Sequence, residues 1–364
     1  MSGFELAVEG IDYPVWVGAR EEIDDRLNRL IAGRDLLVVT DGNVASVHLE
    51  SFRASFASAA RLETLVLPPG ESEKTLAGFE RIIAALVAGR FHRDAVVVAL
   101  GGGVVGDTAG FAAACYQRGV DWIAVPTTLL AQVDAALGGK TAVNHPAGKN
   151  LVGAFHDPVA VWIDPATLAS LPPRELRAGF GEVVKYGLGF DAGFFAWLED
   201  HAEALGMGEQ AGFAAVVEHC ARIKLKIVAA DRTEHSEQGG RVLLNLGHTL
   251  GHALETALGH GYWLHGEAVA VGLVVAAELS RARRRIDPDL PTRLRRLLHA
   301  LHLPAAIPDA LETESLMQGL ALDKKIAGGR LRFVGLEAPG RAVAWNDVAA
   351  DELEQAIDAA RTRP

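Results

Sequence analysis

Short apolar runs rich in β-branched residues alternate with helical patterns along the first half of the chain. They cover residues 35–40, 64–69, 94–100, 122–128 and 159–164. Strands that alternate with helices predict a parallel α/β sheet. The first half is therefore predicted to form an α/β domain.

The pattern of apolar and polar residues changes after the segment LPPREL (171–176). Long amphipathic patterns follow, with almost no strand signal until residues 330–336 and 341–346. Proline cannot continue a strand or occupy a helix interior, so Pro172 and Pro173 indicate a hinge. We expect an α/β domain over residues 1–173 and a mainly helical domain over 174–364.

Composition narrows the class of protein. The 364 residues are 49% hydrophobic and 22% charged, with a formal net charge of −11. This balance is typical of a globular protein and argues against a general nucleic-acid or anionic-membrane partner, which requires a cationic face. Cys115 and Cys220 are too few for a disulfide framework and are expected to be reduced thiols. Neither a signal peptide nor a spanning segment is predicted, which favours the cytoplasm.

The segment LLNLGHTLGHALETALGHGYWLHGE (243–267) carries the strongest chemical signal. His248 and His252 are four residues apart, and His265 follows soon after. Residues four apart share a helix face, and neutral imidazole is a common zinc ligand. The alternative is a helix with two solvated or otherwise satisfied histidines.

Glu182 and Lys185 lie in GFGEVVKYG (179–187), three residues apart, and would share one helix face. They could form only a surface ion pair, which contributes little stability. In the other interpretation, Glu182 joins His248 and His265, because two histidines and a glutamate form a catalytic type of zinc set.

A glycine-rich turn follows the strand predicted at 94–100. Residues 101–107 read GGGVVGD and lead into an apolar helix pattern. Glycines allow backbone amides to approach a ligand, and a helix N-terminus attracts phosphate. The pattern departs from the usual Gly-x-Gly-x-x-Gly fingerprint, and a tight connection without a ligand is the alternative. Polar residues at other predicted strand ends favour a ligand at this edge; they are Asp41, Asn43, Glu71, Lys74, Thr127 and Thr128.

The segment QVDAALGGKTAVNHPAGKN (132–150) is expected to be a loop that binds an anionic, hydroxylated ligand. It supplies Asp134, Lys140, Lys149 and Asn150 among small residues. Lysine donates to phosphate or carboxylate, and asparagine can recognise a hydroxyl. Both lysines could also simply be solvated.

Taken together, these motifs resemble the 3-dehydroquinate synthase family of sugar phosphate cyclases over nearly the whole chain. The most specific are GGGVVGD, VPTTLLAQVD, GGKTAVNHPAGKN, GEVVKYG, LLNLGHTLGHALE and LHGEAVA. The resemblance implies an N-terminal Rossmann-like NAD-binding domain and a C-terminal helical metal-binding domain. It also implies one zinc ion, with cobalt as the alternative, and a homodimer.

The resemblance also assigns roles to residues. Glu182, His248 and His265 match metal ligands, and His252 matches an acid/base group. The other catalytic positions implied are Lys140, Lys185, Asn150 and Glu237. Substrate-binding positions implied are Arg118, Asp134, Lys149, Lys224, Arg241, Asn245, Lys324 and Lys325, with Arg118 offered to the neighbouring subunit. The cofactor positions implied are Asp41, Asn43, Glu71, Lys74, Gly102, Gly103, Val104, Gly106, Asp107, Thr127, Thr128, Lys140, Lys149, Thr167 and Ser170.

One loop departs from the family pattern. Residues 231–241 read DRTEHSEQGGR, a few residues longer than the usual loop with its Glu-x-Gly-x-Arg motif. Glu237 fits that motif best and Glu234 competes with it, so the acid/base carboxylate stays open between the two.

The resemblance implies a lyase of the shikimate pathway. Its substrate would be 3-deoxy-D-arabino-heptulosonate 7-phosphate, and its products 3-dehydroquinate and phosphate. The implied route is transient oxidation by NAD, phosphate elimination, re-reduction, ring opening and intramolecular aldol closure. Three alternatives stay open: a cyclase of sedoheptulose 7-phosphate, a metal-dependent polyol dehydrogenase, and a silent NAD-binding scaffold.

Overall fold

The computed structural model describes residues 3–236, 239–259, 262–326 and 332–361, with only the backbone for residues 20, 21, 24 and 321–326. The chain divides into two compact units. The first comprises residues 1–172 and 213–229, and the second 173–212 and 230–364. The boundary at 172/173 falls at the predicted hinge, but the segment 213–229 lies with the first unit. The two predicted domain ranges themselves stay a prediction.

The first unit is built on a seven-stranded sheet in the order β1-β2-β9-β6-β5-β3-β4. Only β1 and β2 pair antiparallel; the other neighbours are parallel. The strands are β1 (Phe4–Glu5), β2 (Val15–Val17), β3 (Asp35–Asp41), β4 (Arg61–Leu67), β5 (Val96–Gly101), β6 (Asp121–Pro126) and β9 (Ala160–Ile163). The predicted parallel α/β sheet is confirmed.

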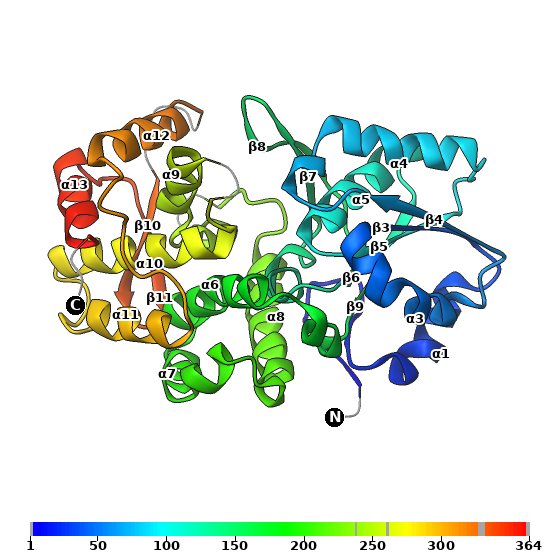
Figure 1. Ribbon diagram of the computed structural model, residues 1–364, viewed down its shortest axis with the longest axis horizontal. Helices are drawn as coiled ribbons and strands as arrows, with labels where there is room; N and C mark the ends of the chain where they lie inside the picture. The colour runs from blue at the N-terminus through cyan, green and yellow to red at the C-terminus, as the bar shows by residue number, and fades with distance from the viewer. Residues whose placement is uncertain (1–2, 237–238, 260–261, 327–331, 362–364) are drawn as a thin grey trace. The chain divides into compact units, whose positions relative to one another are not determined.

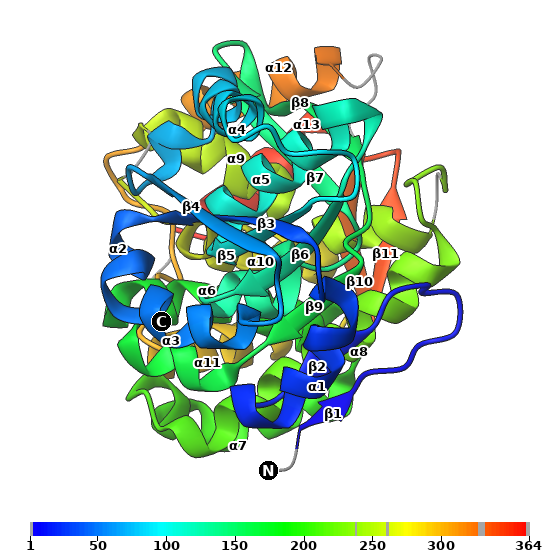
Figure 2. The same ribbon diagram turned by 90° about the vertical axis from the view of Figure 1, so that its right-hand side faces the viewer.

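Helices cover both faces of this sheet (Figures 1 and 2). Successive residues of a strand point to opposite sides, and the central strands are buried along their length, so the apolar side chains on both faces must be covered. Leu36 and Val38 of β3 join a core with α1 (Arg20–Ile31) and α3 (Glu50–Arg53). On the other face, α5 (Gly103–Cys115) contacts β3, β5 and β6. The unit also contains α2 (Gly42–Val44), α4 (Leu76–Ala88) and α8 (Phe213–Ala230).

The segment 132–150 is not the open loop that we expected. It forms a π-helical turn (Ala131–Ala135) and most of a hairpin of β7 (Lys140–His145) and β8 (Gly148–Phe155). Thr141 and Val143 alternate with more exposed neighbours and are buried, at 2% and 0% exposure, so one face of β7 packs inward. The run predicted at 64–69 also shifts, to 61–67, because Pro68 and Pro69 cannot continue the strand.

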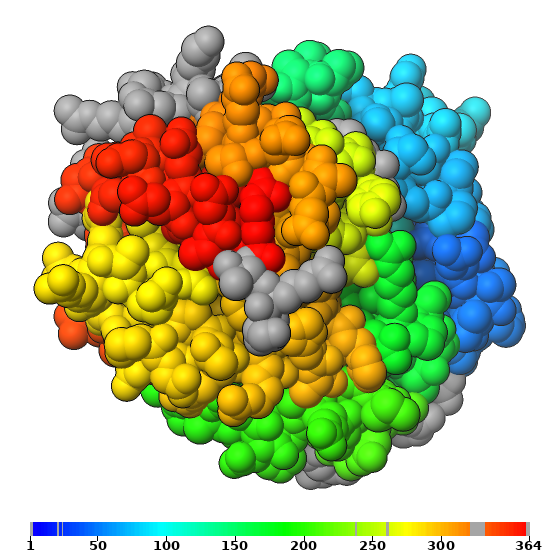
Figure 3. Space-filling view, turned by 60° about the vertical axis from the view of Figure 1, so that its left-hand side comes forward, coloured from blue at the N-terminus to red at the C-terminus, as the bar shows by residue number. Residues whose placement is uncertain are grey.

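The second unit is helical, as predicted. Its helices are α6 (Pro173–Phe190), α7 (Ala192–Gly206), α9 (His248–Leu258), α10 (His265–Ala282), α11 (Leu290–Ala300), α12 (Thr313–Ile326) and α13 (Ala350–Ala359). The two predicted C-terminal strands form a hairpin of β10 (Phe333–Ala338) and β11 (Arg341–Trp345). The apolar helix α10 is buried along most of its length and contacts α6, α9, α11, α13 and β10. Figure 3 shows α13 on the surface of this unit, beside α10 and α12.

Both cysteines are free thiols, as expected. Within the described ranges, no helix is long and apolar enough to cross a bilayer.

Candidate active site

Three predicted metal ligands converge in the second unit. Glu182 lies in the middle of α6, whereas His248 and His265 are the first residues of α9 and α10. The Nε2 atoms of both imidazoles lie 3.3 Å from the same oxygen of Glu182, Oε1. Lys185 approaches the other oxygen, with 2.5 Å between its Nζ and Oε2. One carboxylate oxygen and two imidazole nitrogens are therefore left facing one another.

Close backbone approach brings these three helices together. A Cβ on Gly266 would collide with the carbonyl of Ala178, and a Cβ on Gly181 would collide with the carbonyl of Gly266, so α6 and α10 cross in backbone contact. Gly272 meets the carbonyl of Gly247 in the same way, just before α9 begins. Glycine at these crossings lets the helices approach closely enough for Glu182 to reach both histidines.

Electrostatics keep Glu182 ionised although it is fully buried. Burial alone would raise its pKa, but the charges of Lys185 and His248 outweigh burial and hold the pKa well below its usual range. Burial would likewise lower the pKa of His265, yet the carboxylates of Glu182 and Glu255 raise it to about 9. In the metal-free protein, His265 therefore retains a proton that a metal ion would displace.

The cluster fits a zinc ion. Zinc–ligand bonds of about 2.0–2.1 Å at tetrahedral angles place neighbouring ligand atoms about 3.3–3.4 Å apart. The two Oε1–Nε2 separations of 3.3 Å already have this value. Within the described part of the chain, neither oxygen of Glu182 accepts a hydrogen bond of good geometry, although both are buried. A cation would satisfy Oε1, and three protein ligands would leave a coordination position open.

His252 lies beside this cluster. Its ring centroid is 5.7 Å from that of His248 and 6.1 Å from that of His265, and its side chain is exposed. Glu255, one turn further along α9, is 5% exposed and approaches Nδ1 of His265 at 3.5 Å. The sequence analysis missed Glu255, although its spacing of seven residues from His248 puts both on one helix face.

The glycine turn of the first unit has the predicted form of strand, turn and helix. Gly102 is the N-cap of α5, while Gly103, Val104, Gly106 and Asp107 belong to its first turns. A Cβ on Gly106 would meet no atom within 4 Å, so open space adjoins the helix there. The adjoining hollow is lined by small residues of the turn and of 131–136. The space and the exposed amide groups of the helix N-terminus suit a pyrophosphate.

Most of the polar residues predicted at strand ends lie where they were expected. Asp41 ends β3 and accepts from the backbone amides of Asn43 and Val44. Lys74 forms an ion pair of 2.5 Å with Asp107, whose pKa is raised by burial although Lys74 opposes the shift.

The threonine and serine hydroxyls predicted to contact the cofactor differ in the hydrogen bonds that they already form. Thr127 is 3% exposed, and its hydroxyl has no hydrogen-bond partner among the described residues. The hydroxyl of Thr128 accepts from the amide of Ala131. Thr167 bonds Gln132 and the carbonyl of Asp164, whereas Ser170 lies 2.6 Å from Nε2 of His48. Thr127 is thus the one of these four whose hydroxyl is left without a partner among the described residues.

Asn144 connects two parts of the first unit, which the sequence analysis did not foresee. Its backbone amide donates to the carbonyl of Lys74 (2.8 Å), and its Nδ2 donates to Glu71 (2.7 Å). Its Oδ1 accepts from the backbone amide of Asn150 (3.0 Å), a residue held at φ 54°. The β7–β8 hairpin, which carries Lys140 and Lys149, is therefore tied to the loop after β4.

Two other predicted substrate-binding residues of the first unit contact each other: Lys224 in α8 and Asp134 in the turn before β7. Lys224 is 6% exposed and contacts both the carboxylate and the carbonyl oxygen of Asp134 at 2.6 Å. Arg118, by contrast, is exposed and adopts φ 67°. Only Arg118 of these three is open to a partner in solution.

The loop before η8 (Gly240–Asn245) anchors Arg241 and Asn245 in the second unit. Arg241 is 1% exposed and donates to the carbonyl of Arg232 (2.7 Å). Asn245 donates to Glu234 at 3.4 Å. Glu237 lies outside the described residues, as do the side chains of Lys324 and Lys325. The choice between Glu234 and Glu237 therefore stays open.

Two solved structures with this fold and at least 26% identity are sugar phosphate cyclases, which gives the class of the protein. A solved 2-epi-5-epi-valiolone synthase from Streptomyces hygroscopicus subsp. jinggangensis 5008, with NAD+ and Zn2+ bound, is 30% identical with a TM-score of 0.88, covering 97% of this chain and 98% of its own. A 2-deoxy-scyllo-inosose synthase complexed with carbaglucose-6-phosphate, NAD+ and Co2+ is 26% identical with a TM-score of 0.86, covering 98% and 100%.

Sequence comparison identifies the family within this class. Residues 64–178 and 179–326 match the N-terminal and C-terminal patterns of 3-dehydroquinate synthase. A 3-dehydroquinate synthase from Shewanella sp. (strain MR-4) is 45% identical over 346 residues, which are 95% of this chain and 96% of that protein. The chain belongs to the 3-dehydroquinate synthase family.

Proposed function

We propose that this protein converts 3-deoxy-D-arabino-heptulosonate 7-phosphate into 3-dehydroquinate and inorganic phosphate, as a lyase of the shikimate pathway. The observation that carries the proposal is the buried cluster of Glu182, His248 and His265 in a chain of this family. Its ligand atoms have the spacing of a catalytic metal site.

NAD+ and a divalent ion, zinc or alternatively cobalt, are the proposed cofactors. When bound, NAD+ accepts a hydride and later returns it, while the metal polarises the reacting hydroxyl, so the overall conversion involves no net oxidation. Glu182, His248 and His265 would hold the ion. The α5 N-terminus would face the pyrophosphate, with the remaining predicted cofactor positions lining the nucleotide; they are Asp41, Asn43, Glu71, Lys74, Gly102, Gly103, Val104, Gly106, Asp107, Thr127, Thr128, Lys140, Lys149, Thr167 and Ser170.

Proton transfer falls to His252 and a loop carboxylate. An imidazole titrates near neutral pH, and His252 is exposed beside the metal ligands. It can therefore exchange protons with substrate or solvent while His248 and His265 remain ligands. Glu237 is the carboxylate we assign to the same task, with Glu234 as its competitor.

Cationic and amide side chains would hold the substrate's anionic ends and hydroxyls. In the first unit, the β7–β8 hairpin supplies Lys140, Lys149 and Asn150. In the second unit, Lys185 is 1% exposed and turned toward Glu182, which fixes its ammonium beside the metal cluster. Their positive charge stabilises the phosphate as it leaves. We assign the binding of the substrate's anionic ends and hydroxyls also to Lys224, Arg241, Asn245, Lys324 and Lys325, with Asp134 positioning Lys224.

We further propose a homodimer in the cytoplasm, in which Arg118 serves the neighbouring subunit's phosphate site. The exposure of Arg118 supports this assignment. Its test is Arg118→Ala mixed with an inactive His248→Ala chain. Restored turnover on mixing would establish sharing between subunits, whereas no restoration would refute it.

The function is tested by incubating the protein with NAD+, zinc and the heptulosonate phosphate. Phosphate release and NADH absorbance are followed together, and the product is identified by NMR. Phosphate with dehydroquinate and no accumulating NADH is the expected result. Stoichiometric NADH without phosphate would indicate a polyol dehydrogenase. Turnover of sedoheptulose 7-phosphate alone would indicate the related sugar phosphate cyclase that acts on that substrate.

A further inference from the structure

The imidazole of His265 faces a different carboxylate at each ring nitrogen. Its Nε2 lies 3.3 Å from Oε1 of Glu182, and its Nδ1 lies 3.5 Å from Oε1 of Glu255. Glu255 has no place in the ligand set described above, yet it is only 5% exposed. Burial of a carboxylate is costly unless a partner compensates for the lost hydration.

His248 shows the same arrangement with a different acceptor. Its Nε2 faces Glu182, and its Nδ1 lies 3.2 Å from the backbone carbonyl of Leu246. A neutral imidazole carries one N–H, so an acceptor at Nδ1 favours the tautomer whose Nε2 lone pair is free for a metal. Each ligand histidine therefore has an oxygen acceptor near its Nδ1, a backbone carbonyl for His248 and a carboxylate for His265.

From this geometry, we infer that Glu255 is a positioning residue. It holds His265 with the proton on Nδ1 and the lone pair of Nε2 directed at the metal position. It acts through His265 and touches no reacting atom. This inference rests on the proposed function only in taking Glu182, His248 and His265 as metal ligands.

The difference between the two acceptors has a physical consequence. A backbone carbonyl can only orient the ring, but a carboxylate also increases the basicity of the nitrogen opposite it. The His265 side chain is 33% exposed, whereas that of His248 is 13% exposed. The more exposed ligand is thus the one whose Nδ1 faces a side-chain carboxylate.

A second metal site is the competing explanation for Glu255. His252, Glu255 and His265 also bring possible ligand atoms within 4.8 Å of one another. That site would use Nδ1 of His265, which would have to lose its remaining proton and bridge two ions. The two explanations differ in metal stoichiometry, with one ion per chain in the first and two in the second.

The test measures zinc affinity of the full-length apoprotein by competition with a chromophoric chelator. Glu255→Ala should weaken zinc binding about 10- to 100-fold, the usual effect of losing such an outer partner. Glu255→Gln should weaken it less, because the amide oxygen still accepts from Nδ1 but carries no charge. The wild-type chain should bind one zinc ion.

Glu278→Gln is the matched control. Glu278 is another buried carboxylate of the second unit, 7% exposed and paired with Arg295. This variant should lower the melting temperature and leave zinc affinity unchanged, which separates loss of positioning from general loss of stability.

Three outcomes would overturn the inference: unchanged zinc affinity in Glu255→Ala and Glu255→Gln, an equal loss in Glu278→Gln, or two zinc ions bound by the wild type. Failure of the proposed function has a different signature. The wild type would then bind zinc yet release no phosphate from the heptulosonate, and the affinity series would still test Glu255.

Discussion

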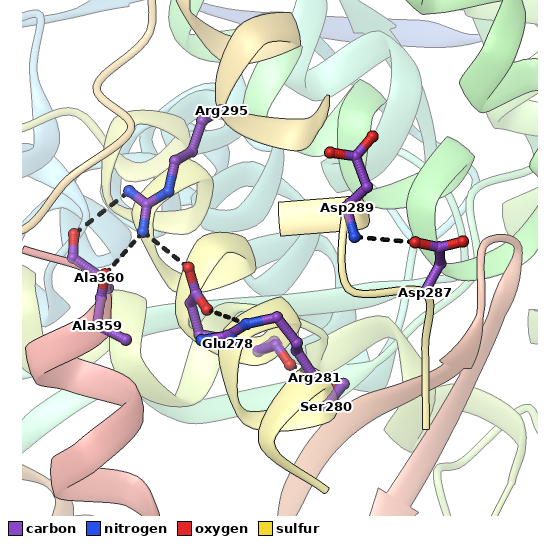
Figure 4. A network of polar contacts seen from close by, with 9 residues as sticks. Glu278, Ser280, Arg281, Asp287, Asp289, Arg295, Ala359 and Ala360 are labelled. Atoms are coloured by element: carbon purple, nitrogen blue, oxygen red, sulfur yellow. Dashed lines mark hydrogen bonds and ion pairs between the residues drawn. The ribbon is translucent and has the colours of Figure 1, made fainter. Parts of the chain in front are cut away.

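Two charge clusters of the second unit are each built around a buried carboxylate, but they differ in how completely that carboxylate is paired. One contains Glu182 and Lys185 with two histidines, and the other contains Glu278 with Arg281 and Arg295. In the Arg295 cluster, shown in Figure 4, the guanidinium contacts Glu278 at 3.1 Å and the carbonyls of Ala359 and Ala360 at the end of α13 at 3.0 and 3.4 Å. It also reaches the carbonyl of Ala305 at 2.6 Å.

The difference lies in which groups are satisfied. Arg295 uses its donors on a carboxylate and on helix-end carbonyls, so its cluster is complete within the protein. At Glu182, an oxygen and two imidazole nitrogens converge without a well-aligned hydrogen bond among the described residues. A complete network stabilises a fold, whereas a buried carboxylate oxygen on which two imidazole nitrogens converge indicates a place for a cation.

The largest expected effect is the removal of a metal ligand. His248→Ala should abolish both zinc binding and turnover, because two protein ligands cannot hold the ion in a catalytic geometry. His252→Ala should retain zinc and lose about 10²–10⁴-fold in kcat, the usual contribution of a general acid or base. Zinc analysis and steady-state kinetics measure both. Loss of zinc from His252→Ala would contradict the division of roles.

Breaking the Arg295 cluster should lower the stability of the fold and leave zinc binding unchanged. Arg295→Ala leaves Glu278 paired with Arg281 alone, so the cost should be at most about 3–5 kcal/mol, the cost of breaking a buried pair outright. We expect that loss in the free energy of unfolding, measured by urea denaturation, with one zinc ion still bound per chain. A variant that lost zinc but kept its stability would reverse our assignment of the two clusters.

The clusters should also respond differently to pH, since only the metal cluster contains imidazoles. The pKa of His265 is raised from 6.5 to about 9 in the metal-free fold. Its stabilising contribution is therefore fully present below pH 6.5 and is lost as the pH rises through 9. Zinc must displace this proton, so apparent zinc affinity should increase with pH up to about 9. Chelator competition across this range checks the slope, and a flat profile would show that His265 binds no proton in the apoprotein.

The smallest effect is expected at Asn144, whose side-chain hydrogen bonds are exposed. Water can replace its hydrogen bonds, each worth about 0.5–1.5 kcal/mol, so Asn144→Ala should change KM for NAD+ or substrate about 2- to 10-fold. Asn144→Asp is the informative partner variant, because it keeps the acceptor for Asn150 and repels Glu71. A larger KM for NAD+ in Asn144→Asp than in Asn144→Ala would locate the effect at Glu71. A KM for NAD+ close to that of the wild type in Asn144→Asp would locate the effect at Asn150, because that variant keeps the acceptor.

Local pattern predicted much of the first unit. The strand, turn and helix at 94–115 follows from a β-branched run, three glycines and an apolar helix, all adjacent in the chain. The segment 132–150 was predicted less well, because its pairing as a hairpin depends on Thr141 and Val143 finding a buried face. Only the rest of the unit supplies that face.

The sequence by itself determined which chemistry this protein could carry. The spacing of His248, His252 and His265, the glycine turn and the ordered family motifs required no coordinates. The tertiary structure decided which atoms meet. Backbone contact at Gly181, Gly266 and Gly272 turns both Nε2 atoms toward one oxygen of Glu182 and brings Glu255 to Nδ1 of His265. Separation along the chain gives no measure of such distances, because they depend on how closely three helices cross.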